Sequence, residues 1–385
     1  MTPTNIHIIG AGVAGLTTAL LLSRDSRYRV VVSAKHMPGD YDTEYASPWA
    51  GANYMPVSRN GTDASKWDEA TWPLLEELAH NHPEAGVHFQ GQQSMKRDQS
   101  LRAASTNKSS ECEIYTRRKD AQSATAAWFA DLLSLSPWFK DIVPNFRVLP
   151  KEDLTRDIEY ATAFTSVCIN TAIYLPWLLS QCVKNGVKFR RATFQHIREA
   201  VNATDAEHRA NVIVNCTGLG AAVLGGVADE TVVPARGQIV LVRNETGGRM
   251  LNFSGTDDGD DEACYIMGRA LGGGTVIGGS YQKGNWNGQV DMDLANRILE
   301  RAARAFPALT GGTREAKNFD IIRHGVGLRP VREGGARVEL ERLSDDGVWV
   351  VHNYGHGGAG YQSSYGCALA AVKLVDEITV LRARL

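Results

Sequence analysis

The sequence predicts an α/β chain of two domains, a Rossmann-type nucleotide-binding domain and a second domain built on an antiparallel sheet. A strand, a glycine-rich turn, a helix and a second strand open the chain, and the stretch 237–279 is rich in strand patterns. A length of 385 residues suits two domains or one large composite domain. We expect the nucleotide-binding domain to be discontinuous, over 1–60, 140–225 and 320–385, with the second domain over 61–139 and 226–319.

Each element is predicted from its residue pattern. Short apolar, β-branched runs bounded by turn residues predict strands, and apolar residues three and four apart predict helices. In chain order we expect a strand over 5–9, a helix over 13–24, a strand over 28–33, helices over 121–135 and 174–185, strands over 187–191, 211–215, 238–243 and 275–279, a helix over 291–306, strands over 337–341 and 348–352, and a helix from the glycine-rich loop at 355–360 to the end. The polar stretch from Gln90 to Lys119 is expected to be a loop or an insertion.

Composition excludes several classes of protein. Hydrophobic residues make up 43% and charged residues 22%, as in ordinary globular proteins. With 41 basic and 43 acidic residues the chain lacks the positive excess of a nucleic-acid binder. The sequence contains no run of about 18 apolar residues, so no membrane span is expected. The six cysteines and ten histidines show no metal-ligand spacing, so no metal site is expected.

The glycine-rich turn predicts a dinucleotide site. Gly10 permits the tight turn, Gly12 lets the backbone approach a pyrophosphate, and Gly15 lets the helix pack on the strand. The pyrophosphate then lies at the helix N-terminus, where free N–H groups and the helix dipole favour anions. We expect Ala11 and Val13 to contact the cofactor with these glycines.

The end of the second strand argues against an ordinary NAD site. An acidic residue usually binds the ribose hydroxyls there, but this chain has Ala34 and Lys35. Lys35 could face a 2′-phosphate, as in NADP sites, or lie along the adenosine of FAD.

Three further motifs suggest ligand contacts. Thr217 and Gly218 follow a buried strand, at a place where flavoenzymes contact the ADP part of FAD, although an ordinary strand end is an equally good interpretation. The loop at 355–360 holds four glycines before a helix and can present N–H groups to the N1–C2=O edge of a reduced flavin. Arg329 lies in an apolar context, where it binds either a ligand carboxylate or an internal acid.

These segments together resemble the D-amino-acid oxidases, the FAD-dependent family that includes D-aspartate oxidase, and above all its fungal members. The resemblance covers nearly the whole chain, in 7–22, 45–53, 215–221, 234–238, 265–267, 278–281, 326–332 and 352–366. It implies non-covalent FAD and oxidative deamination of a D-amino acid to a 2-oxo acid, ammonia and H2O2, with O2 reoxidising the flavin.

The resemblance also implies roles for individual residues. Arg329 would bind the substrate carboxylate and contact the cofactor, the Tyr265 hydroxyl would add a hydrogen bond to that carboxylate, and the Gly358 carbonyl would accept from the substrate amine. No residue is expected to act as an acid or a base, because hydride transfer depends on orientation over the flavin. The remaining expected cofactor contacts are Ser47, Gly51, Ala52 and Asn53 along the flavin and ribityl chain, Val167 near the adenine, and Gly357, Gly358, Gly360, Tyr361 and Gln362 at the flavin O2 edge.

Two departures from the family pattern bear on the substrate. Many members carry a second active-site tyrosine before the position of Tyr265, but no tyrosine stands in 250–255 of this chain. D-aspartate oxidases have an arginine where this chain has Tyr281, which favours neutral D-amino acids. D-aspartate oxidase remains the alternative within the family. An NAD(P)-dependent reductase and a non-catalytic flavoprotein remain alternatives from other classes.

The last three residues, Ala383-Arg384-Leu385, resemble a peroxisomal targeting signal. Together with a predicted H2O2 producer, they favour the peroxisomal matrix and an import receptor as a partner. A homodimer is a further expectation, and neither a nucleic-acid nor a membrane partner is expected.

Overall fold

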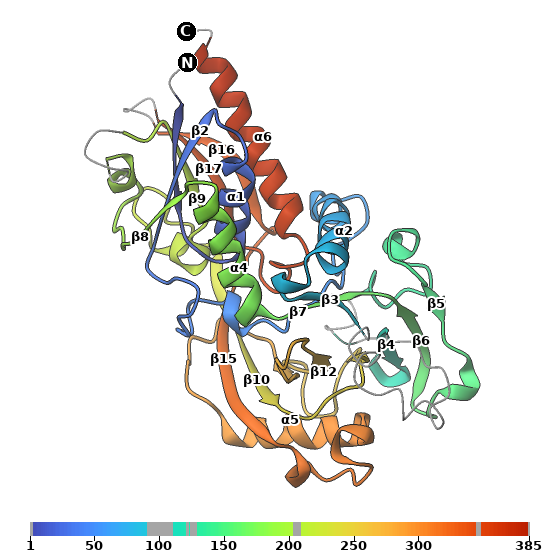
Figure 1. The fold of residues 1–385 in the computed structure, drawn as a ribbon. Helices are drawn as coiled ribbons and strands as arrows, with labels where there is room; N and C mark the ends of the chain where they lie inside the picture. Colours follow the sequence, from blue (N-terminus) through green and yellow to red (C-terminus); the bar gives the residue numbers. More distant parts are fainter. Residues whose placement is uncertain are drawn as a thin grey trace.

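The computed structural model describes residues 3–90, 111–120, 123, 129–202, 209–343 and 348–383. Two sheets dominate the molecule. One lies with most of the helices at the end of the molecule where the termini meet, and the other lies at the opposite end above α5 (Met292–Ala305) (Figure 1).

The first sheet has six strands in the order β16-β17-β9-β1-β2-β8. All neighbouring pairs are parallel except β16 with β17. Its strands are β1 (Thr4–Ile9), β2 (Tyr28–Ala34), β8 (Lys188–Arg191), β9 (Val212–Asn215), β16 (Arg337–Arg342) and β17 (Trp349–Tyr354). Strands from both termini and from the middle of the chain therefore form one nucleotide-binding sheet, as the sequence predicts.

Four helices accompany this sheet. They are α1 (Val13–Ser23), α2 (Asp63–Asn81), α4 (Thr171–Lys184) and α6 (Ser364–Ala383). Helix α1 packs against α4 and α6, and α2 packs against α6. Most residues of α1 are buried, which explains its nearly continuous apolar sequence. A two-stranded pair, β3 (Val87–Phe89) with β7 (Val167–Ile169), lies beside α2.

The second sheet has nine strands, with the path β14-β10-β13-β12-β11-β4-β6-β5 and β15 paired to β10. It consists of β4 (Cys112–Arg117), β5 (Arg147–Val148), β6 (Ile158–Phe164), β10 (Val232–Val242), β11 (Met250–Phe253), β12 (Glu262–Gly268), β13 (Thr275–Ser280), β14 (Gln282–Lys283) and β15 (Ile321–Arg332). Its pairs are antiparallel apart from β4 with β11.

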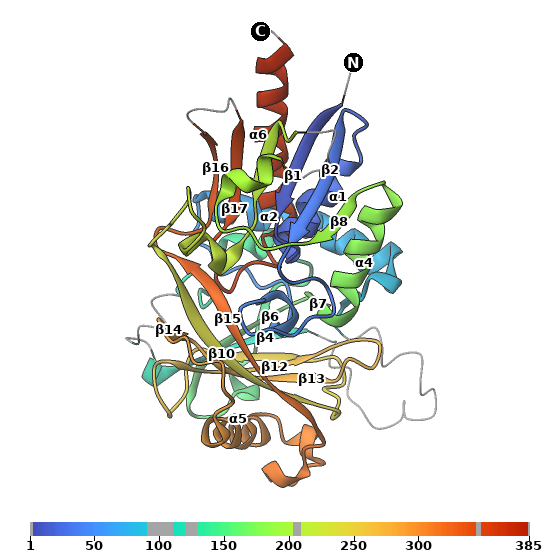
Figure 2. The same ribbon diagram turned by 90° about the vertical axis from the view of Figure 1, so that its left-hand side faces the viewer.

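The β10–β15 ribbon connects the two sheets. Its antiparallel pairing extends from Val232 with Arg332 to Val242 with Ile321. The two strands run side by side from the first sheet towards α5 (Figure 2).

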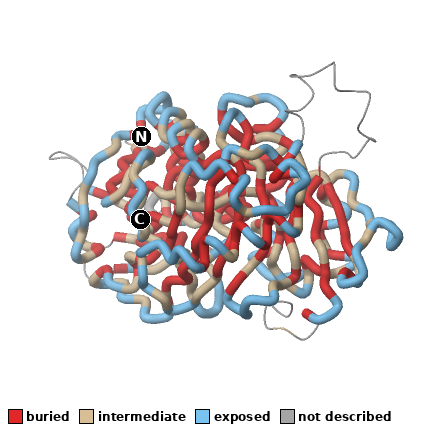
Figure 3. Tube along the Cα trace, turned by 90° about the horizontal axis from the view of Figure 1, so that it is seen from below, coloured by how far each residue is buried: buried red, intermediate tan, exposed pale blue. Residues whose placement is uncertain are grey.

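Buried residues are concentrated in the interior of both parts (Figure 3). The largest core cluster packs between the first sheet and its helices and extends to the second sheet, where it includes Ile114, Ile239 and Met267. A separate cluster joins α5 to the second sheet, where Leu294 and Ile298 pack with Val240 and Ile277. Within the described residues, none of the helices has the length and apolar character that crossing a bilayer requires.

Most predicted elements lie where the pattern placed them, with two differences. The expected loop over Gln90–Lys119 is wrong at its end, because 112–117 forms β4; residues 91–110 lie outside the described residues. The expected helix over 121–135 lies partly outside them, and 129–133 form turns.

The predicted domain boundaries stay a prediction, but some elements pair or pack with the other part of the molecule than these boundaries imply. Strands β5 and β6, expected in the nucleotide-binding domain, pair within the second sheet, as does β15. Conversely, α2, which was expected in the second domain, packs on α6.

Candidate functional site

A large cavity of about 1490 Å³ is lined by residues of both sheets. Its walls come from the carboxyl ends of β1, β2 and β9, from the loop before α6, and from β10, β12 and β15. Crevices at the carboxyl ends of parallel strands are where open α/β sheets bind ligands. The cavity brings together almost all the predicted site residues: Gly10, Ala11, Gly12, Val13, Ala34, Lys35, Ser47, Gly51, Ala52, Asn53, Thr217, Gly218, Tyr265, Arg329, Gly357, Gly358, Gly360, Tyr361 and Gln362.

The glycine-rich turn is packed so tightly that no side chain fits at Gly10 or Gly15. Gly10 has a φ of +113°, and a Cβ atom there would lie 2.3 Å from the Cys216 carbonyl oxygen. Gly15 does not line the cavity. A Cβ atom on it would lie 2.0 Å from the Gly10 oxygen, so Gly15 holds α1 against the turn.

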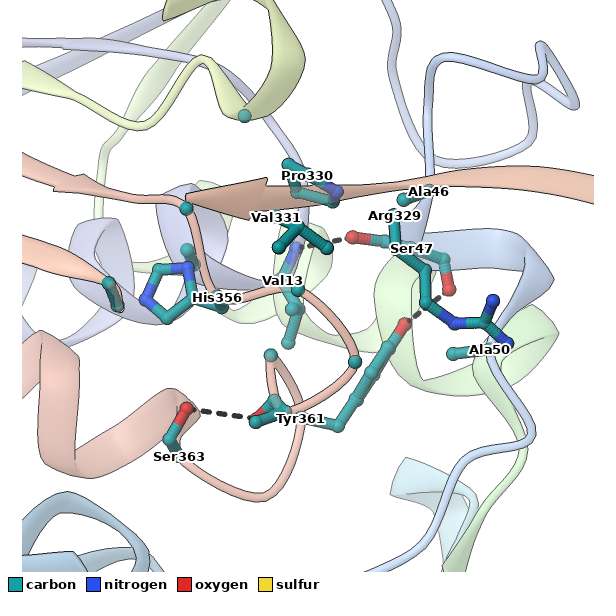
Figure 4. Close-up of a pocket in the computed structure, with 18 of the residues that line it drawn as sticks. Val13, Ala46, Ser47, Ala50, Arg329, Pro330, Val331, His356, Tyr361 and Ser363 are labelled. Atoms are coloured by element: carbon teal, nitrogen blue, oxygen red, sulfur yellow. Dashed lines mark hydrogen bonds between the residues drawn. The ribbon is translucent and has the colours of Figure 1, made fainter. Parts of the chain in front are cut away.

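The N-terminus of α1 faces the cavity. Gly12 is the N-cap residue and supplies no side-chain cap. The Val13 N–H donates to the Ser47 hydroxyl at 3.1 Å, and the Tyr361 hydroxyl donates to the Ser47 carbonyl at 2.9 Å (Figure 4). Ser47 thus connects the helix end to the loop before α6.

One end of the cavity lies where β2 and β8 end. Lys35 lines it, but its ammonium pairs with Glu44 at 2.9 Å. His36, Asp42 and Glu44 bring ligand atoms within 4.8 Å of one another nearby. The residues that follow β8, Ala192–Gln195, line the same end and were missed by sequence reasoning.

Val167, like Gly15, is an expected cofactor contact that does not line the cavity. It is fully buried in β7, and its carbonyl accepts from the Tyr54 N–H. It does not line the cavity, so the expectation that it lies near an adenine does not fit the structure. The position beside the end of β2 belongs instead to the segment containing Thr193 and Phe194.

The segment from Ser47 to Asn53 lines the middle of the cavity and is held from behind by a buried arginine. The Arg269 guanidinium donates to the Gly51 carbonyl at 2.5 Å, to the Ala50 carbonyl at 2.6 Å and to the Thr171 hydroxyl at 3.0 Å. Burial lowers the pKa of Arg269 from its usual value. No sequence motif pointed to this residue.

The loop before α6 closes another wall. Gly355 and Gly357 have φ values of +84° and +57°, which glycine tolerates, and the Gly357 N–H donates to the Pro330 carbonyl at 2.8 Å. Gly358 lies over Arg329, where a Cβ atom would be 3.8 Å from its Cδ. The loop therefore lies between the first turn of α6 and Arg329.

Arg329 projects from β15 over Gly237 of the neighbouring strand β10. Its guanidinium donates to the Ser280 carbonyl at 3.0 Å. A Cβ atom on Gly237 would lie 2.1 Å from Nη1, so this glycine on β10 makes room for the guanidinium. Among the described residues no carboxylate lies within ion-pair distance of Arg329. The interpretation of Arg329 as one half of an internal ion pair therefore does not hold there.

Tyr265 lies against the same face from β12. A Cβ atom on Gly278 would lie 1.9 Å from its ring, so the ring fills the space that this glycine leaves. Burial raises the pKa of the Tyr265 phenol, and the charge and hydrogen bonding of Arg329 act against that increase. The phenol is therefore protonated at neutral pH.

A second aromatic ring beside Arg329 is Tyr281, whose ring centre is 5.4 Å from the guanidinium carbon. The segment 250–255, where many members of the family carry a second tyrosine, contributes Asn252 and Phe253 to the cavity wall. Beside Arg329, a second tyrosine thus comes from the residue that follows β13.

Comparison with known proteins identifies a family, relatives and solved structures that this chain resembles. The family model described as FAD dependent oxidoreductase matches residues 5–374. A D-amino-acid oxidase of Fusarium vanettenii is 48% identical over 97% of each chain, and one of Schizosaccharomyces pombe is 37% identical over 97% of this chain and 96% of the relative. A crystal structure of glycine oxidase from Geobacillus kaustophilus has a TM-score of 0.69 with 18% identity, over 98% of this chain and 95% of that chain.

Proposed function

The chain belongs to the family of FAD-dependent oxidoreductases, and we propose that it catalyses the oxidative deamination of D-amino acids. The products are a 2-oxo acid, ammonia and H2O2. The observation that carries the proposal is the Arg329 guanidinium, which lines the cofactor cavity with no carboxylate of the described chain beside it.

The residues of the cavity fit FAD. The close packing at Gly10, where a Cβ atom would not fit, leads to the N-terminus of α1, whose N-cap glycine brings no side chain of its own. This arrangement suits a pyrophosphate. Ala34 and Thr193 would flank the adenosine, and the Ser47–Asn53 segment with the loop before α6 would hold the ring system. When bound, FAD accepts the hydride from the substrate and passes electrons to O2.

An α-amino acid needs a cation for its carboxylate and acceptors for its amine. Arg329 can bind a carboxylate through two parallel N–H donors, while the protonated Tyr265 hydroxyl donates a further hydrogen bond. The Gly358 carbonyl, on the loop that crosses Arg329, would accept from the amine. Two anchors on opposite groups orient Cα, and orientation is the main requirement of hydride transfer.

The test is an oxygen-consumption assay coupled to peroxidase detection of H2O2. We expect turnover of D-alanine and D-methionine and none of the L-forms. Arg329→Ala should lower kcat/KM about 100-fold or more, because two charge-assisted hydrogen bonds are lost. Arg342→Ala, which removes an exposed arginine that stacks on Trp349, is the matched control. Absence of H2O2 with every D-amino acid would refute the proposal.

We propose neutral side chains for the substrate. The Tyr281 ring lies beside Arg329, at the position where a second cation would be needed to bind the side-chain carboxylate of a substrate such as D-aspartate. A kcat/KM for D-aspartate above that for D-alanine would instead favour the D-aspartate oxidase alternative.

We also propose the peroxisomal matrix as the location, with the import receptor as a partner. The proposal is supported by the Ala383-Arg384-Leu385 ending, of which the last two residues lie outside the described residues, and by the reactive product. Removing these three residues from a fluorescent fusion should leave it outside peroxisomes, and unchanged import would contradict the proposal. The homodimer stays a prediction, for sedimentation to test.

A further inference from the structure

A buried carboxyl group lies in the cavity wall next to the loop before α6. Asp68, on the inner face of α2, is 1% exposed and lines the cavity. Carboxylates are rarely buried this far without a cation. Among the described residues no Lys, Arg or His lies within ion-pair distance of Asp68, so its charge has only neutral partners there.

Two neutral donors meet one oxygen of this carboxyl group. The Ser58 hydroxyl donates to Oδ2 at 2.7 Å, and the Gln362 side-chain amide donates to the same atom at 3.2 Å. The Tyr54 hydroxyl donates to the Asp68 backbone carbonyl at 3.0 Å, which fixes this turn of α2. The carboxyl group is therefore held rigidly, but its charge is not neutralised.

Burial raises the pKa of Asp68 to about 7, and the two hydrogen bonds act in the opposite direction. The titratable groups packed around it stay neutral at this pH. Burial raises the pKa values of Tyr54 and Cys367 beyond the physiological range. On the loop that carries Gln362, burial lowers the pKa of His356 to about 4, so that ring is neutral as well. Asp68 is thus the group of this cluster that can change charge near neutral pH.

Gln362 connects Asp68 to the cofactor site. It lines the cavity two residues before α6, on the loop that joins the pyrophosphate end to Arg329. An isoalloxazine ring placed between those two ends would have this loop beside it. Reduction of the ring places negative charge on its N1–C2=O edge, where N–H donors and a helix N-terminus are favourable.

We propose that Asp68 takes up a proton when the flavin is reduced and thereby lets the Gln362 amide turn its NH2 group towards the cofactor. While Asp68 is ionised it can only accept, so it keeps the amide nitrogen of Gln362 on its own side. Once protonated, its hydroxyl can donate to the Gln362 carbonyl, and the NH2 group is released to the cavity. Asp68 acts through Gln362 and is a positioning residue.

The step balances without any further reactant. Two electrons enter the flavin from the reductant, one proton enters Asp68 from water, and no bond to carbon is made or broken at Asp68. The proton offsets part of the charge that reduction brings into the buried site. The proposal rests on the cofactor and not on the substrate, so it can be tested with no amino acid present.

The experiment measures the midpoint potential of the bound FAD by photoreduction with a reference dye, from pH 6 to 9. Below pH 7 Asp68 is protonated in both redox states and therefore adds nothing to the pH dependence of the midpoint potential. Above pH 7 it is ionised only in the oxidised enzyme, so reduction takes up an extra proton and the potential falls more steeply with pH. One proton changes the equilibrium tenfold per pH unit, or about 30 mV for a two-electron couple. Asp68→Asn should lose this extra slope.

Two variants isolate the effect. Glu69→Gln removes an exposed carboxyl from the same helix and should keep the extra slope. Gln362→Leu leaves Asp68 in place but cuts its link to the cofactor, so the extra slope should shrink. An extra slope that survives in Asp68→Asn, or that the wild-type enzyme lacks, overturns the proposal.

A second measurement needs no variant, in case Asp68→Asn fails to fold. The reduced-minus-oxidised infrared difference spectrum of the wild-type enzyme above pH 7 should gain the C=O band of a protonated carboxylic acid as a carboxylate band is lost. A spectrum without that band overturns the proposal whatever the substrate is found to be.

Discussion

Replacing Gly237 by alanine should weaken substrate binding without replacing a residue that contacts the substrate. The new Cβ atom would lie 2.1 Å from Nη1 and 2.5 Å from Cζ of Arg329. Those atoms are the far end of a flexible side chain, so the guanidinium moves and the backbone stays. Alanine suits the backbone of a β strand, and we expect folding and FAD content to be retained.

The size of the effect follows from the hydrogen bonds at risk. A hydrogen bond to a charged group contributes about 1.5–3 kcal/mol, and every 1.4 kcal/mol is a factor of ten. Displacing one of the two Arg329 donors should therefore lower kcat/KM for D-alanine about 10- to 150-fold, mostly through KM. The assay is initial-rate oxygen consumption at fixed pH, with FAD absorbance used to count active sites.

A double-mutant cycle tests the reasoning. If Gly237→Ala acts by moving Arg329, it should change little in an Arg329→Ala background, since the displaced group is already absent. Equal losses in both backgrounds would show that the alanine acts elsewhere. An unchanged kcat/KM in the single variant, with full FAD content, would refute the steric argument.

Three further predictions concern the cofactor turn, the pocket phenol and acid stability. Gly10→Ala forces a Cβ atom to within 2.3 Å of the Cys216 backbone oxygen at a φ of +113°, so the variant should lose bound FAD and melt well below the wild type; a FAD-to-protein ratio of one would contradict this. Tyr265→Phe should raise KM about tenfold through loss of one hydrogen bond, and a KM like that of the wild type would mean that the hydroxyl does not contact the substrate. Burial lowers the pKa of His7 to about 4 from 6.5, so the unfolded chain binds the proton more readily. The stability that His7 contributes is complete above pH 6.5 and is lost as the pH falls towards 4, and melting curves of His7→Gln should depend less on pH in that window.

Local patterns were enough for the parts of the fold that neighbouring residues determine. The turn from Gly10 to Gly15 and the strands on either side of it follow from glycine conformations and short apolar runs. Strand β4 was missed because buried charges hide its pattern. Glu113 pairs with Arg249 at 2.7 Å, and Arg117 pairs with Asp120 at 2.7 Å, so both look like solvent-facing residues in the sequence.

The site was predictable where a motif or the family resemblance named a residue, and not where distant strands meet. Gly237 lies 92 positions before Arg329, and only the pairing of β10 with β15 brings them together. Phe194 was missed for the same reason, because nothing in the sequence says that β8 lies beside β2. Asp68 gave no signal either, since a carboxylate on a helix is usually exposed.

The β10–β15 ribbon has a consequence for engineering. Arg329 and Pro330 are consecutive on β15; the first faces the expected substrate position, and the carbonyl of the second receives the Gly357 N–H of the cofactor loop. The distance between the carboxylate anchor and the cofactor is therefore fixed by one peptide unit, whatever happens elsewhere in the second sheet. The β11 wall at Asn252 and Phe253 is free of that constraint, so libraries aimed at new side-chain preferences can vary it while leaving the alignment needed for oxidation intact.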